Sequence, residues 1–328
     1  MSLGDSMDKK RQKLVVMIPA CNEEKTIGKV ITEIPRKIDG VFEVLVLVID
    51  DGSTDRTVEV AEKAGANIII HHKMNKGLAA SFRDGLEASL KIGATVIVNT
   101  DADFQYDQRE IPSLVRPILD RKADIVIGYR DIWHLDHMPA SKKIGNTIAT
   151  FVTRLTSEFP IIDGQSGYRA FSREAALKMN VMSNYTYVQE TVIQAVHKGL
   201  CIAQVPITFR EREGKSRLIS SVFTYAKKGE GIIVRTYRDY SPLKVFVGMG
   251  AVFLFISLLI GGVVLVHYIQ TGMLTPYYGR ALLASIFGMT GVMIMTFGLM
   301  ADMMRTQRLM LEDVLYRVKK MKFGENGD

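Results

Sequence analysis

Short apolar runs alternate with amphipathic stretches in the first part of the chain. Continuous apolar runs of this kind are typical of buried strands, and apolar residues that recur every three or four positions indicate helices. The predicted strands are Leu14–Ile18, Phe42–Ile49, Asn67–Ile70, Thr95–Asn99, Asp124–Ile127 and Ile202–Phe209. The predicted helices lie near Lys25–Ile34, Asp55–Ala64, Gly77–Ile92, Gln108–Asp120 and Tyr187–Lys198. This alternation predicts an α/β fold with a mostly parallel sheet and helices on both of its faces.

Two long apolar runs near the C-terminus follow a different pattern. Val245–Val266 contains 22 residues without a charge, and Ala281–Ala301 contains another 21. Each is longer than the ~18 apolar residues that suggest a membrane-spanning helix. A buried core helix is the alternative, but the two runs are adjacent and flanked by charge. We therefore predict a hairpin of two transmembrane helices with a short external loop.

The segment before this hairpin, Leu218–Tyr240, can place its apolar residues on one helical face and its basic residues mainly elsewhere. This pattern favours an amphipathic helix in the membrane interface, with a helix of a soluble domain as the alternative. Gly229 and Gly231 weaken the helix and can divide it in two. After the hairpin, a charged helix near Asp302–Met321 is predicted to stay in the cytoplasm.

Lysine and arginine gather beside the two apolar runs, in a chain whose formal net charge is +7. The basic residues are Lys227, Lys228, Arg235, Arg238 and Lys244 before the first run and Arg305, Arg308, Arg317, Lys319, Lys320 and Lys322 after the second. The loop between the runs holds only Arg280. Because basic flanks stay on the cytoplasmic side, we expect both termini there and Thr271–Tyr278 outside. The position of the charges favours anionic lipid headgroups over nucleic acid as the partner.

These patterns divide the 328 residues into five expected parts. They are an N-terminal tail (1–13), an α/β domain (14–217), juxtamembrane amphipathic helices (218–244), the transmembrane hairpin (245–301) and a cytoplasmic C-terminal helix (302–328). We expect an integral membrane protein, in the plasma membrane if the source is prokaryotic. The start of the chain has no apolar h-region, so no signal peptide is expected. Cys21 and Cys201 show no metal-ligand spacing, and His134 and His137 are interpreted as loop residues.

Two carboxylates stand at the end of the predicted strand Thr95–Asn99, in the sequence Asp101-Ala102-Asp103. A strand there delivers them to the carboxyl edge of the sheet, where ligands bind in open α/β folds. Two hard oxygen ligands suit a Mg²⁺ or Mn²⁺ ion that also holds a diphosphate. A solvated turn is the alternative for so short a motif.

Two earlier loops carry polar residues at strand ends. The side chains of the loop that starts at Pro19 could hold a nucleobase or ribose, although Asn22 could instead cap the next helix. In the second loop, Asp50 and Asp51 could accept hydrogen bonds from ribose hydroxyls or a base N–H. Asp55, a few residues later, is expected to cap the helix that follows.

A third loop places Lys76 and Gly77 at the start of a predicted helix. Backbone N–H groups and a cation at a helix start can bind a phosphate. The loop is no P-loop, because the pattern G-x-x-x-x-G-K-[ST] is absent. Together with the acidic motif, the three loops imply a nucleotide-diphosphate ligand with a divalent metal.

Five motifs in this order and spacing resemble those of family 2 glycosyltransferases, which have the GT-A fold. They are P-A-C-N-E-E, D-D-G-S-T-D, N-K-G-L-A-A, D-A-D-F-Q and D-G-Q-S-G-Y-R-A-F. Within the family, the chain looks like the polyprenyl-phosphate branch, to which dolichyl-phosphate mannose synthases belong. The resemblance covers residues 14–217 and implies that this part is a Rossmann-like catalytic domain. The hairpin that follows matches a two-span layout known in that branch.

The loops and the resemblance together assign roles to individual residues. Nucleotide binding falls to Pro19, Asn22, Glu23, Asp50, Asp51, Lys76, Gly77, Asp101 and Ala102, and metal binding to Asp101, Asp103 and Gln105. The resemblance implies catalytic roles for Asp103, Arg130, Arg169 and Glu190, and a donor-sugar contact for Ser166 and Gly167. It places the acceptor phosphate near Lys142, Lys143, Arg212, Lys215 and Arg217.

Several of these assignments have structural alternatives. Arg169 and Lys142 could serve the fold alone, and Glu190 could be a core or capping residue. Relatives often carry an arginine pair where this chain has Lys142 and Lys143. Lysine keeps the charge but cannot make the bidentate fork of arginine, which weakens the expected phosphate clamp.

The expected reaction transfers a sugar from a nucleotide diphosphate to a polyprenyl or dolichyl phosphate, with inversion at the anomeric carbon. A processive polysaccharide synthase is the first rival, but the only tryptophan is Trp133, preceded by Ile132, so its Q-x-x-R-W motif is absent. A transferase with a soluble or protein acceptor is the second rival, and an inactive membrane scaffold is the third. The juxtamembrane basic loop and the intact acidic motif argue against them. The sugar, the choice of UDP or GDP and the oligomeric state stay open.

Overall fold

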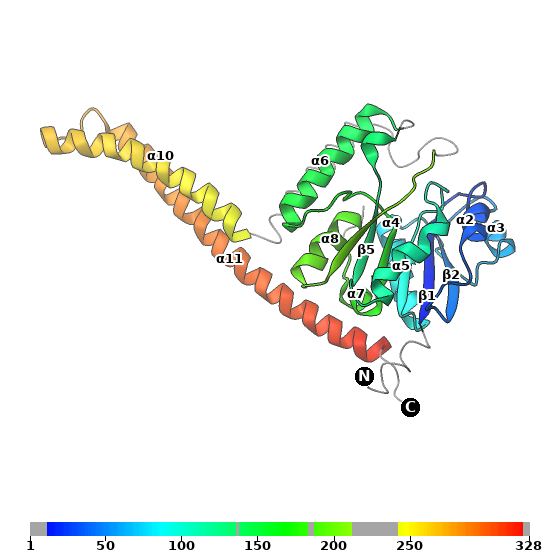
Figure 1. Cartoon of the computed structure of the whole chain (residues 1–328). Coiled ribbons are helices and arrows are strands. Elements are labelled where there is room, and N and C mark those ends of the chain that lie inside the picture. Colours follow the sequence, from blue (N-terminus) through cyan, green and yellow to red (C-terminus); the bar gives the residue numbers. More distant parts are fainter. Residues whose placement is uncertain (1–11, 136–137, 183–186, 212–241, 324–328) are drawn as a thin grey trace. The chain divides into compact units, whose positions relative to one another are not determined.

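The computed structural model describes residues 12–135, 138–182, 187–211 and 242–323. They belong to two compact units. The first comprises Met1–Glu230 together with Leu315–Asp328, and the second comprises Gly231–Val314. The first unit contains a sheet with its helices, and the second contains a helical hairpin (Figure 1).

The first unit is built on a seven-stranded sheet in the order β3-β2-β1-β4-β6-β5-β7. The strands are β1 (Lys13–Ala20), β2 (Glu43–Asp50), β3 (Ile68–His71), β4 (Val96–Asn99), β5 (Ile125–Tyr129), β6 (Arg169–Ser172) and β7 (Ile202–Pro206). β6 pairs antiparallel with both β4 and β5, whereas the other pairs are parallel. The predicted mostly parallel sheet is therefore confirmed.

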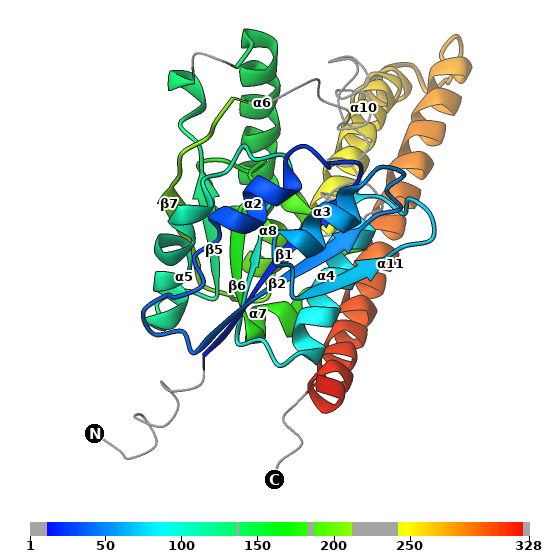
Figure 2. The same cartoon turned by 90° about the vertical axis from the view of Figure 1, so that its right-hand side faces the viewer.

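Helices cover both faces of this sheet, as Figure 2 shows. They are α2 (Ile27–Glu33), α3 (Thr57–Lys63), α4 (Leu78–Lys91), α5 (Ile111–Leu119), α6 (Ala140–Ser157), α7 (Arg173–Lys178) and α8 (Val188–His197), with the 3-10 turns η2 (Gln108–Glu110) and η3 (Ile132–His134). Successive residues of β1 alternate between two apolar cores: Leu14 packs into a core with α2 and α5, and Val15 into one with α4, α7 and α8. Each fully buried side chain of this size contributes ~1.5–3 kcal/mol to folding, so both layers stabilise the sheet.

Residues 130–186 hold the elements that the sequence patterns did not predict. β6, α6 and α7 all lie in this stretch. β6 spans only 4 residues, begins with a buried arginine, and so lacks the apolar run of the other strands. β7 ends at Pro206, before the predicted end at Phe209, although Phe209 still forms a bridge to Tyr106.

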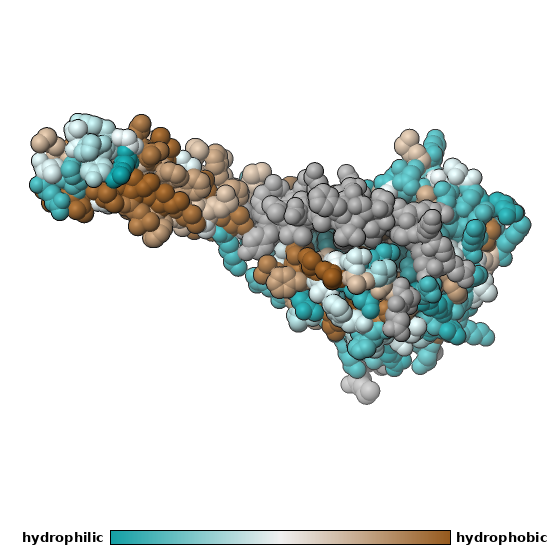
Figure 3. Space-filling model, turned by 90° about the horizontal axis from the view of Figure 1, so that it is seen from above, coloured by the Kyte–Doolittle hydropathy of each residue, from teal (hydrophilic) through white to brown (hydrophobic). Residues whose placement is uncertain are grey.

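The second unit contains the helical hairpin formed by α10 (Pro242–Thr271) and most of α11 (Tyr278–Phe323). By length and composition, α10 and α11 could each cross a membrane. Hydrophobic residues gather along the surface of the hairpin (Figure 3). A Cβ atom at Gly250 would lie 2.8 Å from the carbonyl oxygen of Gly291, so small residues let the two backbones approach closely.

The C-terminal part of α11, from Leu315, belongs to the first unit. Tyr316 donates to Glu174 at 2.8 Å, and Lys319 donates to the carbonyl oxygen of Met179 at 2.8 Å. Phe323 is buried in the core that lies on the α4 side of the sheet. The helix predicted near Asp302–Met321 is thus no separate element, because α11 runs without a break from Tyr278 to Phe323.

Candidate active site

The acidic motif leaves the sheet at the carboxyl end of β4, beside the antiparallel strand β6. Asn99, the last residue of β4, is fully buried. Its Nδ2 donates to the carbonyl oxygen of Gly167 at 2.8 Å and to the hydroxyl oxygen of Tyr187 at 2.7 Å. These bonds hold the S-G-Y-R motif next to the D-A-D motif, although the two are far apart in the sequence.

Gly167 lies against the carboxylate of Asp101 with little room for a side chain. A Cβ atom here would lie 3.3 and 3.4 Å from the two carboxylate oxygens and 2.9 Å from the hydroxyl oxygen of Tyr187. The N–H of Gly167 donates to the hydroxyl oxygen of Tyr106 at 3.0 Å. Burial and the charge of Asp101 raise the pKa of both Tyr106 and Tyr187, so both phenols stay protonated at neutral pH.

We expect Gly167→Ala to slow turnover by about 10- to 100-fold, because a displacement of ~1 Å at a reacting centre costs about that much. The new methyl group must push either the Asp101 carboxylate or the Tyr187 hydroxyl away from its present position. Turnover at saturating substrate and thermal unfolding would be measured together. Gly279→Ala is the control, because a Cβ atom there meets nothing within 4 Å. Unchanged turnover in Gly167→Ala would show that this close approach has no catalytic importance.

The loop beyond Asp101 turns sharply at Phe104, whose φ of 63° is in the left-handed region. Such a conformation in a non-glycine residue costs ~1–3 kcal/mol and persists only when its surroundings hold it. Asp103 accepts the N–H of Gln105 at 3.2 Å. Gln105 is bound in turn to the chain after β7: its carbonyl oxygen accepts the N–H of Arg210 at 2.7 Å.

Asp101 and Asp103 offer two partly exposed carboxylates at one strand end. Among the residues that the structure describes, there is no group of three or more His, Cys, Asp or Glu side chains that could hold a metal. A pair of carboxylates fits Mg²⁺ or Mn²⁺, which often take one or two protein carboxylates and complete their coordination with substrate phosphates and water. The donor set is therefore suited to a metal that arrives with a diphosphate.

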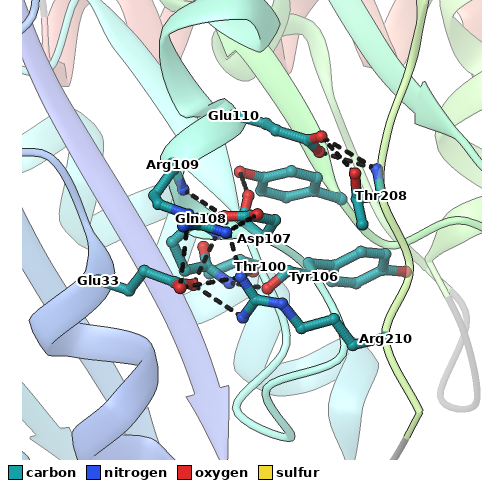
Figure 4. Close-up of polar contacts among 10 residues, drawn as sticks. Glu33, Thr100, Tyr106, Asp107, Gln108, Arg109, Glu110, Thr208 and Arg210 are labelled. Carbon is teal, nitrogen blue, oxygen red and sulfur yellow. Dashed lines mark hydrogen bonds and ion pairs between the residues drawn. The ribbon is translucent and has the colours of Figure 1, made fainter.

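Residues 207–210, which we call the strap, cross the acidic loop and are tied to it by ion pairs (Figure 4). Arg210 makes a bidentate ion pair with Glu33, at 2.9 and 2.8 Å, and also contacts Asp107 at 3.0 Å. Its guanidinium group lies 4.5 Å from the centroid of the Phe104 ring, within cation–π distance. Arg210 thus covers the residue that carries the unusual backbone conformation.

A second anchor holds the strap to the chain that follows the acidic loop. Glu110 accepts from both the N–H of Thr208, at 2.9 Å, and its hydroxyl group, at 2.8 Å. Nearby, hydrogen bonds from Arg109 and the charge of Arg210 lower the pKa of Asp107 to about 2, so this carboxylate stays ionised at neutral pH. The acidic loop is therefore supported by fixed charges on the side of the strap.

The first polar loop is tied to the second rather than to the next helix. The Asn22 carbonyl oxygen accepts the N–H of Thr54 at 2.7 Å, and the N–H of Glu23 donates to the Thr57 hydroxyl at 2.8 Å. The residue at the N-cap position of α2 is Thr26, so the alternative that Asn22 caps this helix is wrong. Pro19, at the end of β1, is buried. Hydrogen bonds to the second loop thus hold the first loop in place.

Asp50 is fully buried at the end of β2. One carboxylate oxygen lies 2.5 Å from Nδ1 of His71, and the other accepts the N–H of Ser53 at 3.1 Å. Its predicted ligand contact is untested, and its burial gives it a place inside the fold. Asp55 accepts the N–H of Thr57, the first residue of α3, at 3.0 Å, but the residue at the N-cap position is Arg56, one position after the predicted cap.

Asp51 holds the third loop in place. Its two oxygens accept the N–H groups of Lys76, at 2.8 Å, and Gly77, at 2.9 Å, and it also contacts His72 at 2.9 Å. Burial would raise the pKa of Asp51, but these hydrogen bonds lower it. Both N–H groups that were predicted to face a diphosphate are therefore bound to Asp51. The Lys76 ammonium group, 3.4 Å from Asp84, is the part of the loop that could reach a phosphate.

Arg130 forms a buried, bidentate ion pair with Asp163. Nε lies 2.6 Å from one carboxylate oxygen and Nη2 lies 3.1 Å from the other. Burial alone would lower the pKa of Arg130, but the Asp163 carboxylate holds it above its usual range. Asp163 also accepts the N–H of Gln165 at 3.0 Å. Arg130 thus fixes the start of the segment that carries Ser166 and Gly167.

Arg169 is fully buried, and the groups to which it donates hydrogen bonds within the described residues are neutral oxygens. It donates to the carbonyl oxygen of Ser166 at 2.8 Å, to that of Val188 at 2.6 Å and to the Thr191 hydroxyl at 2.6 Å. Burial lowers its pKa to about 10, so it stays charged at neutral pH. The side chain joins the S-G-Y-R motif to the start of α8.

Glu190 lies in the first turn of α8 and binds within the fold. It accepts the N–H of Met182 at 2.9 Å and the Gln194 side chain at 3.0 Å. These contacts give Glu190 a structural role within the fold, although the residue at the N-cap position of α8 is Tyr187. Its predicted contact with a sugar hydroxyl stays a prediction.

The predicted acceptor residues are divided between described and undescribed parts of the chain. Lys142 and Lys143 lie in the first turn of α6, and Nζ of Lys143 donates to the carbonyl oxygen of Trp133 at 3.1 Å. Arg212, Lys215 and Arg217 lie outside the described residues. Ala102, between the two acidic residues, is buried.

Sequence reasoning missed several residues that shape this site: Glu33, Tyr106, Asp163, Tyr187 and Arg210. Each acts through a partner that is distant in sequence, so no local motif predicts its role. A buried position for Tyr106 could have been inferred from its place directly after the acidic motif. The Glu33–Arg210 pair, which joins residues 177 positions apart, left no signal in a single sequence.

The chain matches the family described as "Glycosyl transferase family 2" over residues 15–179. A UDP-N-acetylglucosamine–dolichyl-phosphate N-acetylglucosaminyltransferase of Methanococcus voltae is 31% identical over 216 residues, which are 59% of this chain and 84% of that protein. A dolichyl-phosphate hexose transferase of Haloferax volcanii is 33% identical over 205 residues, which are 62% of this chain and 86% of that protein.

Among solved structures, the fold is similar to that of glucosyl-3-phosphoglycerate synthase from Mycobacterium tuberculosis, crystallised with Mn²⁺, UDP-glucose and phosphoglyceric acid. The TM-score is 0.56 at 20% identity, and the match covers 72% of this chain and 84% of that one. At this identity the likeness concerns the fold, which agrees with the GT-A architecture that the sequence motifs implied.

Proposed function

Because the chain belongs to glycosyl transferase family 2, we propose that it transfers a sugar from a nucleotide diphosphate to a polyprenyl or dolichyl phosphate in a membrane. The observation that carries the proposal is the Asp101–Gly167 contact at the carboxyl edge of the sheet, in a chain that also has two candidate membrane-spanning helices. The names of the dolichyl-phosphate transferases described above support the lipid acceptor.

The acceptor in this reaction is a phosphate monoester, whose oxygen is already anionic near neutral pH. It therefore needs little deprotonation, and the site does not require a strong general base. The main difficulty is that two anions must approach each other. Cationic side chains near the acceptor would offset this repulsion, and Lys142, Lys143, Arg212, Lys215 and Arg217 are the residues that we assign to it.

Asp101 and Asp103 would hold Mg²⁺ or Mn²⁺, with Gln105 as a further predicted ligand. The ion, when bound, would neutralise the charge of the departing nucleoside diphosphate. Pro19, Asn22 and Glu23 would line the nucleoside pocket, and Lys76 would contact the diphosphate. An in-line attack by the acceptor oxygen would invert the configuration of the sugar.

Two of the residues first assigned to catalysis act through their neighbours in this proposal. Arg130 and Arg169 hold the segment with Ser166 and Gly167 from its two ends, through Asp163 and through α8. They would position the donor-sugar contacts and add positive charge beneath them. Glu190 would orient a sugar hydroxyl from the first turn of α8.

We further propose that both termini and the catalytic domain lie on the cytoplasmic face of the membrane. The basic residues that flank the apolar runs support this orientation. Residues 14–217 would form the catalytic domain, and most of the predicted juxtamembrane stretch 218–244 lies outside the residues that the structure describes. The loop near Thr271–Tyr278 would lie outside.

The reaction can be tested by incubating membranes that contain the full chain with radiolabelled UDP- and GDP-sugars and a polyprenyl phosphate. We expect label from one donor to enter an organic-extractable lipid whose sugar–phosphate bond is labile to mild acid. Membranes with Asp103→Ala are the matched control and should label no lipid. Label that appears in a soluble or polymeric product instead would contradict the proposed acceptor.

Removing the charges of Lys215 and Arg217 together should raise the apparent KM for the lipid phosphate. The expected increase is about 10-fold or more, because charge-assisted hydrogen bonds contribute ~1.5–3 kcal/mol each. The affinity for the nucleotide sugar should change little. A double variant that loses donor binding and keeps its acceptor KM would place these residues at the diphosphate instead.

A further inference from the structure

Helix α6 has its large apolar side chains on the outside. Ile144, Ile148, Phe151 and Leu155 are each more than half exposed, at 53, 57, 62 and 61%. Their spacing of four, three and four residues places them on one face of the helix. A helix on the surface of a water-soluble protein has the opposite arrangement, with the apolar face turned to the core.

The face of α6 that packs against the domain is made of small and hydroxyl-bearing residues. Its buried residues are Ala149, Thr150, Thr153, Thr156 and Ser157. The hydroxyl groups bind within the fold: Thr153 donates to the carbonyl oxygen of Ala149 at 2.8 Å, and Ser157 to that of Thr153 at 2.6 Å. The helix can therefore bury this polar face without leaving these hydroxyls unbonded, and its apolar residues stay outside.

Trp133, in the turn η3 that precedes α6, is a further exposed apolar residue. Its side chain is 62% exposed, and its carbonyl oxygen accepts from Nζ of Lys143, in the first turn of α6. Lys142, Lys143 and Arg154 add positive charge to the same helix. Large apolar side chains beside a tryptophan and basic residues are typical of a surface that lies in the boundary between lipid headgroups and acyl chains.

We propose that the outer face of α6, with Trp133, inserts into the boundary of the lipid bilayer. Three observations favour lipid over a protein partner. The same chain carries two helices that could cross a membrane, so a bilayer is within reach. The basic residues of α6 complement anionic headgroups. The exposed residues form a single stripe along a helix, which suits a flat apolar layer.

The proposed membrane contact of α6 lies on the side of the sheet that carries the acidic motif. α6 follows β5 and η3, and in Figures 1 and 2 it lies at the end of the sheet where the parallel strands finish. A bilayer on this side would bring lipid headgroups to the carboxyl edge of the sheet. The inference stands on the exposed surface of α6 and does not depend on the proposed reaction.

The single tryptophan of the chain allows a direct test. The full-length protein would be reconstituted into vesicles of phosphatidylcholine and phosphatidylglycerol, with part of the phosphatidylcholine carrying brominated acyl chains. We expect brominated lipid to quench the emission of Trp133, and aqueous acrylamide to quench it weakly. Quenching reports on location, so it can be measured in the absence of substrate.

Three double variants move the tryptophan. Trp133→Phe/Phe151→Trp places it on the stripe, and Trp133→Phe/Ile148→Trp is a second choice if the first folds poorly. Trp133→Phe/Phe42→Trp is the control, because Phe42 is 78% exposed and precedes β2, at the opposite edge of the sheet. We expect brominated lipid to quench Trp at 151 or 148, and only acrylamide to quench it at 42.

Two results would overturn the proposal. Quenching by acrylamide alone at 151 and 148 would show that the stripe faces water. Protection from both quenchers would show that protein covers it, either a second copy or another segment of the chain. Neither result would bear on the sugar-transfer assay, so a failure of this inference can be told apart from a failure of the proposed function.

Discussion

Asp103→Ala should lower turnover by on the order of 10³ or more, the loss that follows removal of a major electrostatic stabiliser. Asp103 is the second carboxylate of the acidic motif and lies next to Phe104, whose left-handed conformation shapes the loop. Without the Asp103 carboxylate, Asp101 would be the only acidic residue of the motif left to hold the metal. Turnover would be measured with saturating nucleotide sugar and lipid phosphate.

The control for this variant is Asp39→Ala, because the Asp39 side chain is fully exposed and lies outside the candidate site. A chelator should abolish the activity of the unaltered protein, and added Mg²⁺ or Mn²⁺ should restore it. Binding of Mn²⁺ in the presence of nucleoside diphosphate, followed by electron paramagnetic resonance, gives a readout independent of turnover. Full activity in excess chelator would refute the metal role.

Arg130→Met should destabilise the catalytic domain by about 3–5 kcal/mol, since it leaves the Asp163 carboxylate buried without its ion-pair partner. Asp163 is fully buried and the Arg130 side chain is 9% exposed. The loss should also slow turnover, because the segment with Ser166 and Gly167 depends on this pair. The free energy of unfolding would be obtained from denaturant titrations that follow the α/β domain in detergent.

The double variant Arg130→Met/Asp163→Asn tests whether the unpaired buried charge of Asp163 causes the loss of stability. Asparagine removes the charge and keeps a side-chain oxygen that can accept the N–H of Gln165. We expect the double variant to be more stable than Arg130→Met alone. Equal stability of the two variants would mean that the buried carboxylate is not the cause of the loss.

The periodicity of the chain was sufficient to predict the parallel core of the fold. β1 and β2 are apolar at nearly every position because helices cover both faces of the sheet, and such runs are easy to recognise. The alternation of strand and helix then placed the acidic motif at the carboxyl edge. The prediction stopped at β6, which is short and whose first residue, Arg169, is buried without a local pattern to show it.

The contacts of the candidate site could not be predicted in the same way. The sequence identified Asp51, Asp101 and Gly167 as important, but it could not show that Asp51 binds the N–H groups of the third loop. Nor could it show that Gly167 lies against Asp101. These contacts join residues that only the folded sheet brings together, so they depend on topology rather than on local pattern.

Helix α6 shows a different reason for a missed element. Its apolar residues recur with helical spacing, so the pattern was present in the sequence between Ile144 and Leu155. The usual assumption that the apolar face of a helix packs against the core would have placed the wrong face of α6 inside. In this helix the buried residues include threonines, whereas the large apolar residues are exposed.

The end of α11 has a consequence for the order in which the protein can be made. Phe323 completes an apolar core whose other members, such as Val15 and Phe82, are synthesised near the start of the chain. Phe323 can therefore join that core only after the hairpin has been synthesised. During translation the nascent domain would lack this contact, and transiently exposed apolar surface is prone to aggregation.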